Sequence, residues 1–99
     1  MIQIDQILVT KQPSEPLRRH FELTIDEVHK YGESFFKPGF SANVCLTDGS
    51  FYSFIRTKEG WESCEMIDEG LGNISEYTVS FEESLDRLLM EVNMRPGKY

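Results

Sequence analysis

An Asp-Gly pair near the middle of the chain constrains the strands on either side of it. Asp48-Gly49 stands between two runs rich in apolar and β-forming residues, 43–47 and 50–56. Asp-Gly between such runs is a strong short-range signal for a β-hairpin with a two-residue turn. This predicts that Thr47 faces Ser50. A second turn at 58–60 then leads into a third strand that ends at Ile67, so we expect a β-meander over residues 40–67.

This pairing decides which side chains share a face of the sheet, because side chains alternate along a strand. One face is predicted to carry Ala42, Val44, Leu46, Phe51, Ser53, Ile55, Cys64 and Met66. The other is predicted to carry Asn43, Cys45, Tyr52, Phe54, Arg56, Trp61, Ser63 and Glu65. The two cysteines then lie on opposite faces, and a disulfide between them would have to pass through the sheet. We therefore expect free thiols and a reducing compartment.

Further strands are expected on both sides of the meander. Ile2 and Ile4 alternate before the phase slips at Ile7 and Val9, which predicts a strand near 2–10 with a bulge. A short strand is predicted near 74–79, after an acidic, glycine-containing loop at 68–73. Residues 17–23 are ambiguous between a returning strand and a helix.

Two capping-box patterns predict the helices. Thr24 with Glu27 and Ser80 with Glu83 have the spacing in which each side chain satisfies a free amide at the start of a helix. Apolar residues follow each pattern at helical intervals, which predicts helices over 24–36 and 80–94. The fold is therefore predicted to be α+β, a single antiparallel sheet packed by two helices. Residues 1–94 would form one compact domain, and 95–99, with Pro96 and Gly97, a flexible tail.

Negative charge is concentrated in the second half of the chain. Residues 59–94 contain ten of the seventeen acidic residues and one basic residue, Arg87. A surface of one sign repels nucleic acid and membrane phosphates and attracts basic proteins. The first residues lack the pattern of a leader, and no apolar run approaches the roughly 18 residues of a membrane span. We expect a cytoplasmic protein with a basic protein partner and no direct binding to nucleic acid or membrane.

Tests for metal and catalytic patterns favour no site. Asp26, His29 and Glu33 make one helical row of ligands without the second row that a di-metal site needs. The segment 68–73 lacks the alternating ligands of a calcium loop. Cys45 has no local feature that would activate its thiol. We expect no enzyme, metal or cofactor, and an enzyme that uses Cys45 or His29 is the third functional interpretation.

The remaining candidate site combines aromatic and acidic side chains. The aromatics are either core residues under a helix or partly exposed anchors for a partner, and the pattern leaves both open. The leading hypothesis is a small acidic protein-binding inhibitor, of the immunity-protein or phage type, that occludes a basic nucleic-acid-handling enzyme stoichiometrically. The alternative is a non-catalytic assembly protein that forms a homodimer through the aromatic sheet face. The predicted partner-binding residues are Tyr52, Phe54, Trp61, Glu62, Glu65, Asp68, Glu69 and Glu76.

Overall fold

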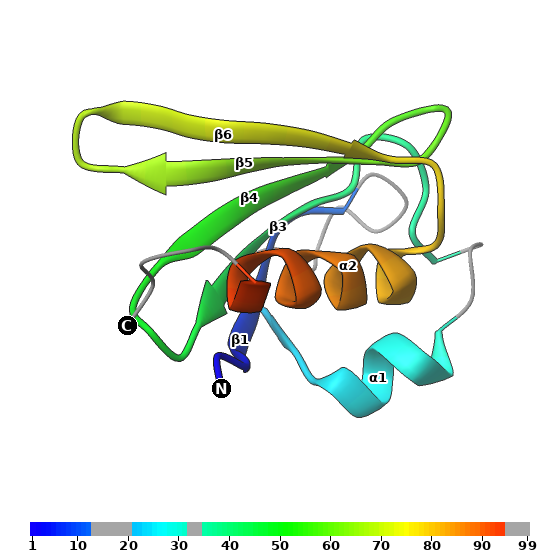
Figure 1. Ribbon diagram of the computed structural model, residues 1–99. Helices are drawn as coiled ribbons and strands as arrows, with labels where there is room; N and C mark the ends of the chain where they lie inside the picture. The colour runs from blue at the N-terminus through cyan, green and yellow to red at the C-terminus, as the bar shows by residue number, and fades with distance from the viewer. Residues whose placement is uncertain (13–20, 32–34, 95–99) are drawn as a thin grey trace.

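The computed structural model describes residues 1–12, 21–31 and 35–94, which form one six-stranded antiparallel sheet and two helices (Figure 1). The strands are β1 (Ile4–Lys11), β2 (Glu22–Leu23), β3 (Ser41–Leu46), β4 (Phe51–Arg56), β5 (Trp61–Ile67) and β6 (Gly70–Tyr77), and the helices are α1 (Ile25–Lys30) and α2 (Phe81–Met94). The strand order is β2-β1-β3-β4-β5-β6. The predicted α+β fold with a single antiparallel sheet is confirmed.

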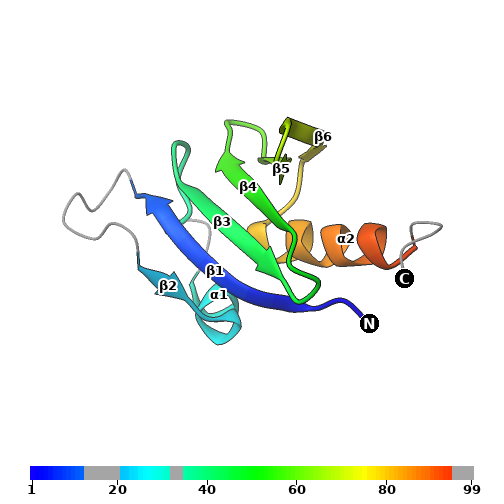
Figure 2. The same cartoon turned by 90° about the vertical axis from the view of Figure 1, so that its left-hand side faces the viewer.

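Both helices lie on one face of the sheet (Figure 2), and the aromatic core lies between them and the strands. The ring of Phe81, the first residue of α2, stacks on Trp61 with centroids 4.2 Å apart. Phe54 and Tyr77 stack nearly parallel at 6.3 Å. In the described part of the chain no helix covers the opposite face, which we call the open face.

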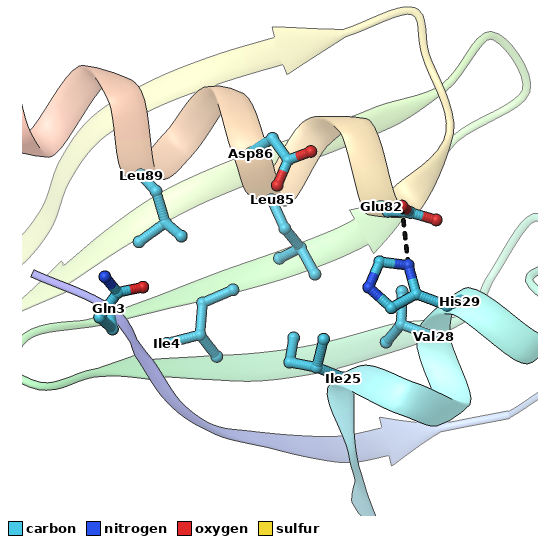
Figure 3. A pocket seen from close by; sticks show the side chains of 9 residues that line it. All are labelled: Gln3, Ile4, Ile25, Val28, His29, Glu82, Leu85, Asp86 and Leu89. Carbon is cyan, nitrogen blue, oxygen red and sulfur yellow. Dashed lines mark ion pairs between the residues drawn. The ribbon is translucent and has the colours of Figure 1, made fainter.

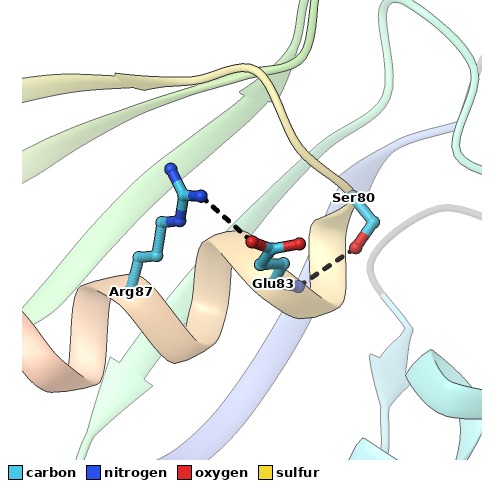
Figure 4. Close-up of polar contacts among 3 residues, drawn as sticks. All are labelled: Ser80, Glu83 and Arg87. Atoms are coloured by element: carbon cyan, nitrogen blue, oxygen red, sulfur yellow. Dashed lines mark hydrogen bonds and ion pairs between the residues drawn. The ribbon is translucent and has the colours of Figure 1, made fainter.

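The helix α2 begins and ends close to its predicted bounds. The Ser80 hydroxyl accepts a hydrogen bond from the Glu83 amide at 3.1 Å, which caps the helix. The Glu83 carboxylate pairs with Arg87 one turn later, at 3.0 Å (Figure 4). At the other end, the Asn93 side chain accepts from the Ile2 amide at 2.8 Å and donates to the Ile2 carbonyl at 3.0 Å. The last turn of α2 is thereby tied to the start of the chain.

The helix α1 begins as predicted but is shorter. Thr24 and Glu27 form the full capping box, with hydrogen bonds of 3.1 and 2.9 Å. The helix ends at Lys30, where the prediction extended it to residue 36, because Tyr31 adopts an extended conformation. Residues 32–34 lie outside the described residues. Phe36 then packs edge-on against Phe40 at 5.1 Å, so the end of the predicted helix is drawn into the aromatic core instead.

The central hairpin differs from its predicted register by one residue. The Leu46 amide donates to the Ser50 carbonyl at 2.8 Å, and the Gly49 amide donates to the Leu46 carbonyl at 3.0 Å. The loop therefore has three residues, 47–49, with Gly49 at a φ of 90°. This is the turn-plus-bulge hairpin that a glycine in the left-handed region permits. The Asp48 carboxylate stabilises it by accepting from the Ser50 amide and hydroxyl, at 3.0 and 2.6 Å.

The shift moves side chains to the face opposite the predicted one. Tyr52 and Phe54 join Ala42, Val44 and Leu46 under the helices, while Phe51, Ser53 and Ile55 lie on the open face.

The two cysteines consequently share the open face, so the prediction of opposite faces is wrong. Cys45 pairs with Phe51 and Cys64 with Ser53, which places the cysteines two strands apart. Two strand spacings amount to about 10 Å, beyond the reach of a disulfide. Both thiols are free, as predicted, but because of this separation.

Two other strands differ in length from the prediction. The strand β6 begins at Gly70, so most of the predicted 68–73 loop is strand and the turn is Asp68-Glu69. In the described part of the ambiguous 17–23 segment, residues 21–23, Glu22–Leu23 is strand; residues 17–20 lie outside the described residues, as does the predicted tail 95–99. The predicted bulge in β1 is confirmed by a register shift between Ile4 and Gln6. No helix in the ranges described combines the length and apolar character needed to cross a membrane.

Candidate protein-interaction surface

The open face carries a strip of exposed and half-buried apolar side chains. Phe51, Met66 and Leu71 lie directly opposite one another across β4, β5 and β6. Ile74 lies one row further along and Ile55 beyond it. Leu71 and Ile74 are 65% and 59% exposed, and Phe51 is 38% exposed. We call Phe51, Ile55, Met66, Leu71 and Ile74 the apolar strip. Contiguous apolar side chains of this kind mark interaction sites more often than isolated ones do.

Carboxylates flank the strip at both ends. Glu62 and Glu76 are directly opposite one another on β5 and β6, beside Ile55. Asp68 and Glu69 form the turn at the other end, six residues or about 20 Å along β5. Within residues 1–12, 21–31 and 35–94, none of these four carboxylates pairs with a lysine or arginine. Each end of the strip therefore keeps its negative charge.

Two arginines close to this region in sequence are engaged by other groups. The Arg56 guanidinium donates to the main-chain carbonyls of Phe36 at 3.0 Å and Gly60 at 3.1 Å, and to that of Thr57. Arg87 pairs with Glu83 on α2. These contacts hold both side chains on the helix-covered side or at its margin.

The structure separates the eight predicted partner-binding residues into three groups. Tyr52, Phe54 and Trp61 are fully buried, so the core alternative is confirmed and these rings are not anchors for a partner or a second copy. Glu65 lies opposite Tyr52 on the helix-covered side, where its carboxylate accepts from Asn73 at 3.4 Å. The remaining acids flank the apolar strip, and they are Glu62, Asp68, Glu69 and Glu76.

Sequence reasoning missed the residues of the apolar strip itself. The predicted register placed Phe51, Ile55 and Met66 on what proved to be the covered face, and Leu71 was assigned to a loop. Asp48-Gly49 is compatible with a three-residue loop as well as a two-residue loop, and only the three-residue loop gives the observed strand register.

The other candidate sites, for a metal ion and for a catalytic thiol, do not form in the described part of the chain. No group of three His, Cys, Asp or Glu side chains there is arranged to hold a metal ion. His29 contacts Glu82 on α2, with Nδ1 2.7 Å from the carboxylate, and Glu33 lies outside the described ranges. Cys45 is on the open face and His29 on the helix side, so these two residues are not neighbours.

No protein family model, curated protein sequence or solved structure matches this chain. Its role is therefore inferred from its own surface.

The direct opposition of Glu62 and Glu76 predicts a gain of stability on mutation. Like charges directly opposite across two strands destabilise a sheet, and opposite charges stabilise it. Glu76→Lys is therefore expected to raise the free energy of unfolding by about 0.2–1 kcal/mol, measured by urea denaturation. The gain should shrink in about 1 M salt, where charges are screened within about 3 Å.

The matched control is Asp68→Lys, which makes the same change of charge at a turn position without a directly opposite carboxylate. If Glu76→Lys is no more stable than Asp68→Lys, the opposed pair does not strain the sheet.

Proposed function

We propose that this protein is a small acidic inhibitor that binds a basic, nucleic-acid-handling enzyme one-to-one and occludes its surface, as an immunity protein or a phage-type inhibitor does. The observation that carries the proposal is the apolar strip with carboxylates at both ends. Protein interfaces have an apolar centre and a polar rim, and the charge of the rim selects the partner. This rim fits a partner whose apolar contact region is bordered by lysines and arginines.

Electrostatic steering accelerates the association of such a protein with its partner. A field of one sign raises the association rate with an oppositely charged partner by one to three orders of magnitude. A nucleic-acid-handling enzyme carries basic residues around its substrate cleft, because it neutralises phosphates. A basic cleft of that kind is the surface that a rigid, acidic sheet face would cover.

A basic partner suits the strip better than a second copy of this chain. Both ends of the strip are acidic, so two copies packed with their strips aligned would bring carboxylates together in either orientation. The net charge of −7 on each chain adds to this repulsion. The homodimer hypothesis also relied on Tyr52, Phe54 and Trp61, which are core residues.

The two free thiols support a reducing compartment such as the cytoplasm as the place of action. Cys45 and Cys64 are half-buried on the open face, beside the strip. Disulfides persist mainly in oxidising compartments, and free thiols are typical of reducing ones.

The test is a pull-down from lysate with the tagged chain, followed by mass spectrometry and binding kinetics. We expect a basic protein to be retained at low salt in a one-to-one complex. The double variant Glu62→Lys/Glu76→Lys should lower its association rate about tenfold, because steering is lost. Leu71→Ser/Ile74→Ser should instead accelerate dissociation, because these side chains are desolvated only in the complex.

The control is Glu91→Lys, which changes one exposed charge on α2, away from the open face. The proposal fails if no basic protein is retained at low salt, or if Glu91→Lys slows association as much as the double variant does. A more stable Glu76→Lys protein with slower association would show that the opposed carboxylates serve binding at the expense of the fold.

A further inference from the structure

A groove on the helix side of the molecule has the chemistry of a binding site for one cationic side chain. It lies between α1 and α2, above the start of β1 (Figure 3), and has a volume of about 230 Å³. Its walls are apolar, formed by Ile4, Ile25, Val28, Leu85 and Leu89. For comparison, an apolar cavity of about 150 Å³ takes up one benzene molecule. The groove therefore admits one long side chain.

The mouth of the groove is acidic. Glu82 and Asp86 stand one turn apart on α2, and Figure 3 shows both beside the opening. The imidazole of His29 contacts Glu82 at 2.7 Å from the α1 side, while Asp86 has no ion partner among the residues described. Gln3 completes the rim. The lining contains no lysine or arginine.

We infer that this groove binds an arginine side chain of a protein partner. The methylenes of arginine would pack on Ile25, Leu85 and Leu89, and its guanidinium would lie between Asp86 and Glu82. Guanidinium is suited to this task because its planar fork of donors matches two carboxylate oxygens and it is more weakly hydrated than an ammonium group. A purely apolar side chain would desolvate Asp86 without giving it a partner, which is unfavourable.

This site is distinct from the open face, because both helices lie on one face of the sheet (Figure 2), whereas Phe51 and Ile55 of the apolar strip alternate with the buried Tyr52 and Phe54 and so lie on the other face. The inference rests on the proposed function only for the source of the arginine, a basic protein. Binding of the side chain itself can be measured without that partner.

The experiment is an NMR titration of the full chain with N-acetyl-arginine N-methylamide. We expect saturable shifts of the backbone amides of Gln3, Ile25, His29 and Leu89. The capped citrulline analogue has nearly the same shape without charge and should bind about tenfold more weakly, since it loses the pairing with two partly exposed carboxylates. Asp86→Asn should weaken arginine binding about threefold, and the matched variant Asp68→Asn should leave it unchanged.

Three results would overturn the inference. The first is an absence of saturable shifts at the groove. The second is equal binding of arginine and citrulline, and the third is tighter binding of a capped norleucine, which would make the groove an apolar site. Spectra of the variants that overlay on the wild type outside the groove exclude misfolding. Whether the open face binds the basic partner is tested separately, by the pull-down with Leu71→Ser/Ile74→Ser.

Discussion

Phe81→Ala is expected to lower the free energy of unfolding by about 3–5 kcal/mol. The ring is buried and stacks on Trp61 at 4.2 Å, and it also contacts Phe36 and Phe54 at 5.1 and 5.9 Å. Removing it leaves a cavity at the point where α2 first meets the sheet, and its aromatic neighbours cannot all collapse into that space. Because small domains are stable by about 5–15 kcal/mol in total, this loss would consume a large part of the stability.

Urea denaturation followed by Trp61 fluorescence measures the effect directly, because Trp61 is the single tryptophan. The matched control is Phe51→Ala, the same substitution on the open face, where the ring is 38% exposed. We expect the free energy of unfolding of Phe51→Ala to fall by less than about 1.5 kcal/mol, because folding removes the Phe51 side chain only partly from water. Equal losses at the two positions would show that α2 does not cover the face assigned to it.

Gly60→Ala is expected to lower the free energy of unfolding by about 3 kcal/mol. A Cβ atom at this position would lie 1.9 Å from the carbonyl oxygen of Tyr77 and 2.9 Å from the Cα of Thr78. Both are main-chain atoms, so no side chain can rotate away. The loop between β4 and β5 would have to move off the end of β6, and the adjacent pairing of Trp61 with Tyr77 would be strained.

Gly49→Ala is the matched control, because it tests conformation without crowding. Gly49 has a φ of 90°, but nothing lies within 4 Å of a Cβ atom built there. The free energy of unfolding of Gly49→Ala should fall by about 1–2 kcal/mol, which is the cost of placing a residue with a Cβ atom in the left-handed region. Urea denaturation of both variants compares the two effects. A Gly60→Ala protein as stable as Gly49→Ala would mean that the contact with Tyr77 relaxes freely.

Local sequence signals predicted the starts of both helices correctly. The capping box at Thr24 and the single cap at Ser80 act within one turn of chain, so their effect does not depend on the rest of the fold. The end of α1 was not predictable in the same way. Phe35 and Phe36 have helical spacing from Val28, but Phe36 packs against Phe40 and Phe81, and tertiary packing overrides local periodicity.

The register of the central hairpin was the decisive error. Asp48-Gly49 is compatible with a two-residue loop and with a three-residue loop that includes Thr47, and the two differ by one residue in pairing. One residue is enough to exchange the faces of a strand. The predicted register therefore placed Tyr52 and Phe54 on the face opposite the core residues Ala42 and Val44, and placed Phe51 and Ile55, which belong to the candidate site, on the same face as those core residues.

The charge of the candidate site could be read from the sequence more reliably than its position. The excess of acids over residues 59–94 does not depend on register, and four of the predicted carboxylates flank the apolar strip. Their separation into two ends could not be foreseen, because Gly70 and Gly72 resemble a loop and β6 was expected to begin at Ile74. Pairing with β5 supplies the hydrogen bonds that make this segment a strand.

The position of α2 after all six strands has a consequence for how the protein is made. While the chain is still on the ribosome, the sheet residues Tyr52, Phe54 and Trp61 emerge before Phe81 and Leu88, which cover them. Exposed aromatic sheet surface promotes aggregation of incomplete chains. The nascent protein therefore completes its fold only when the segment 81–94 has left the exit tunnel, and until then its aromatic sheet residues stay uncovered.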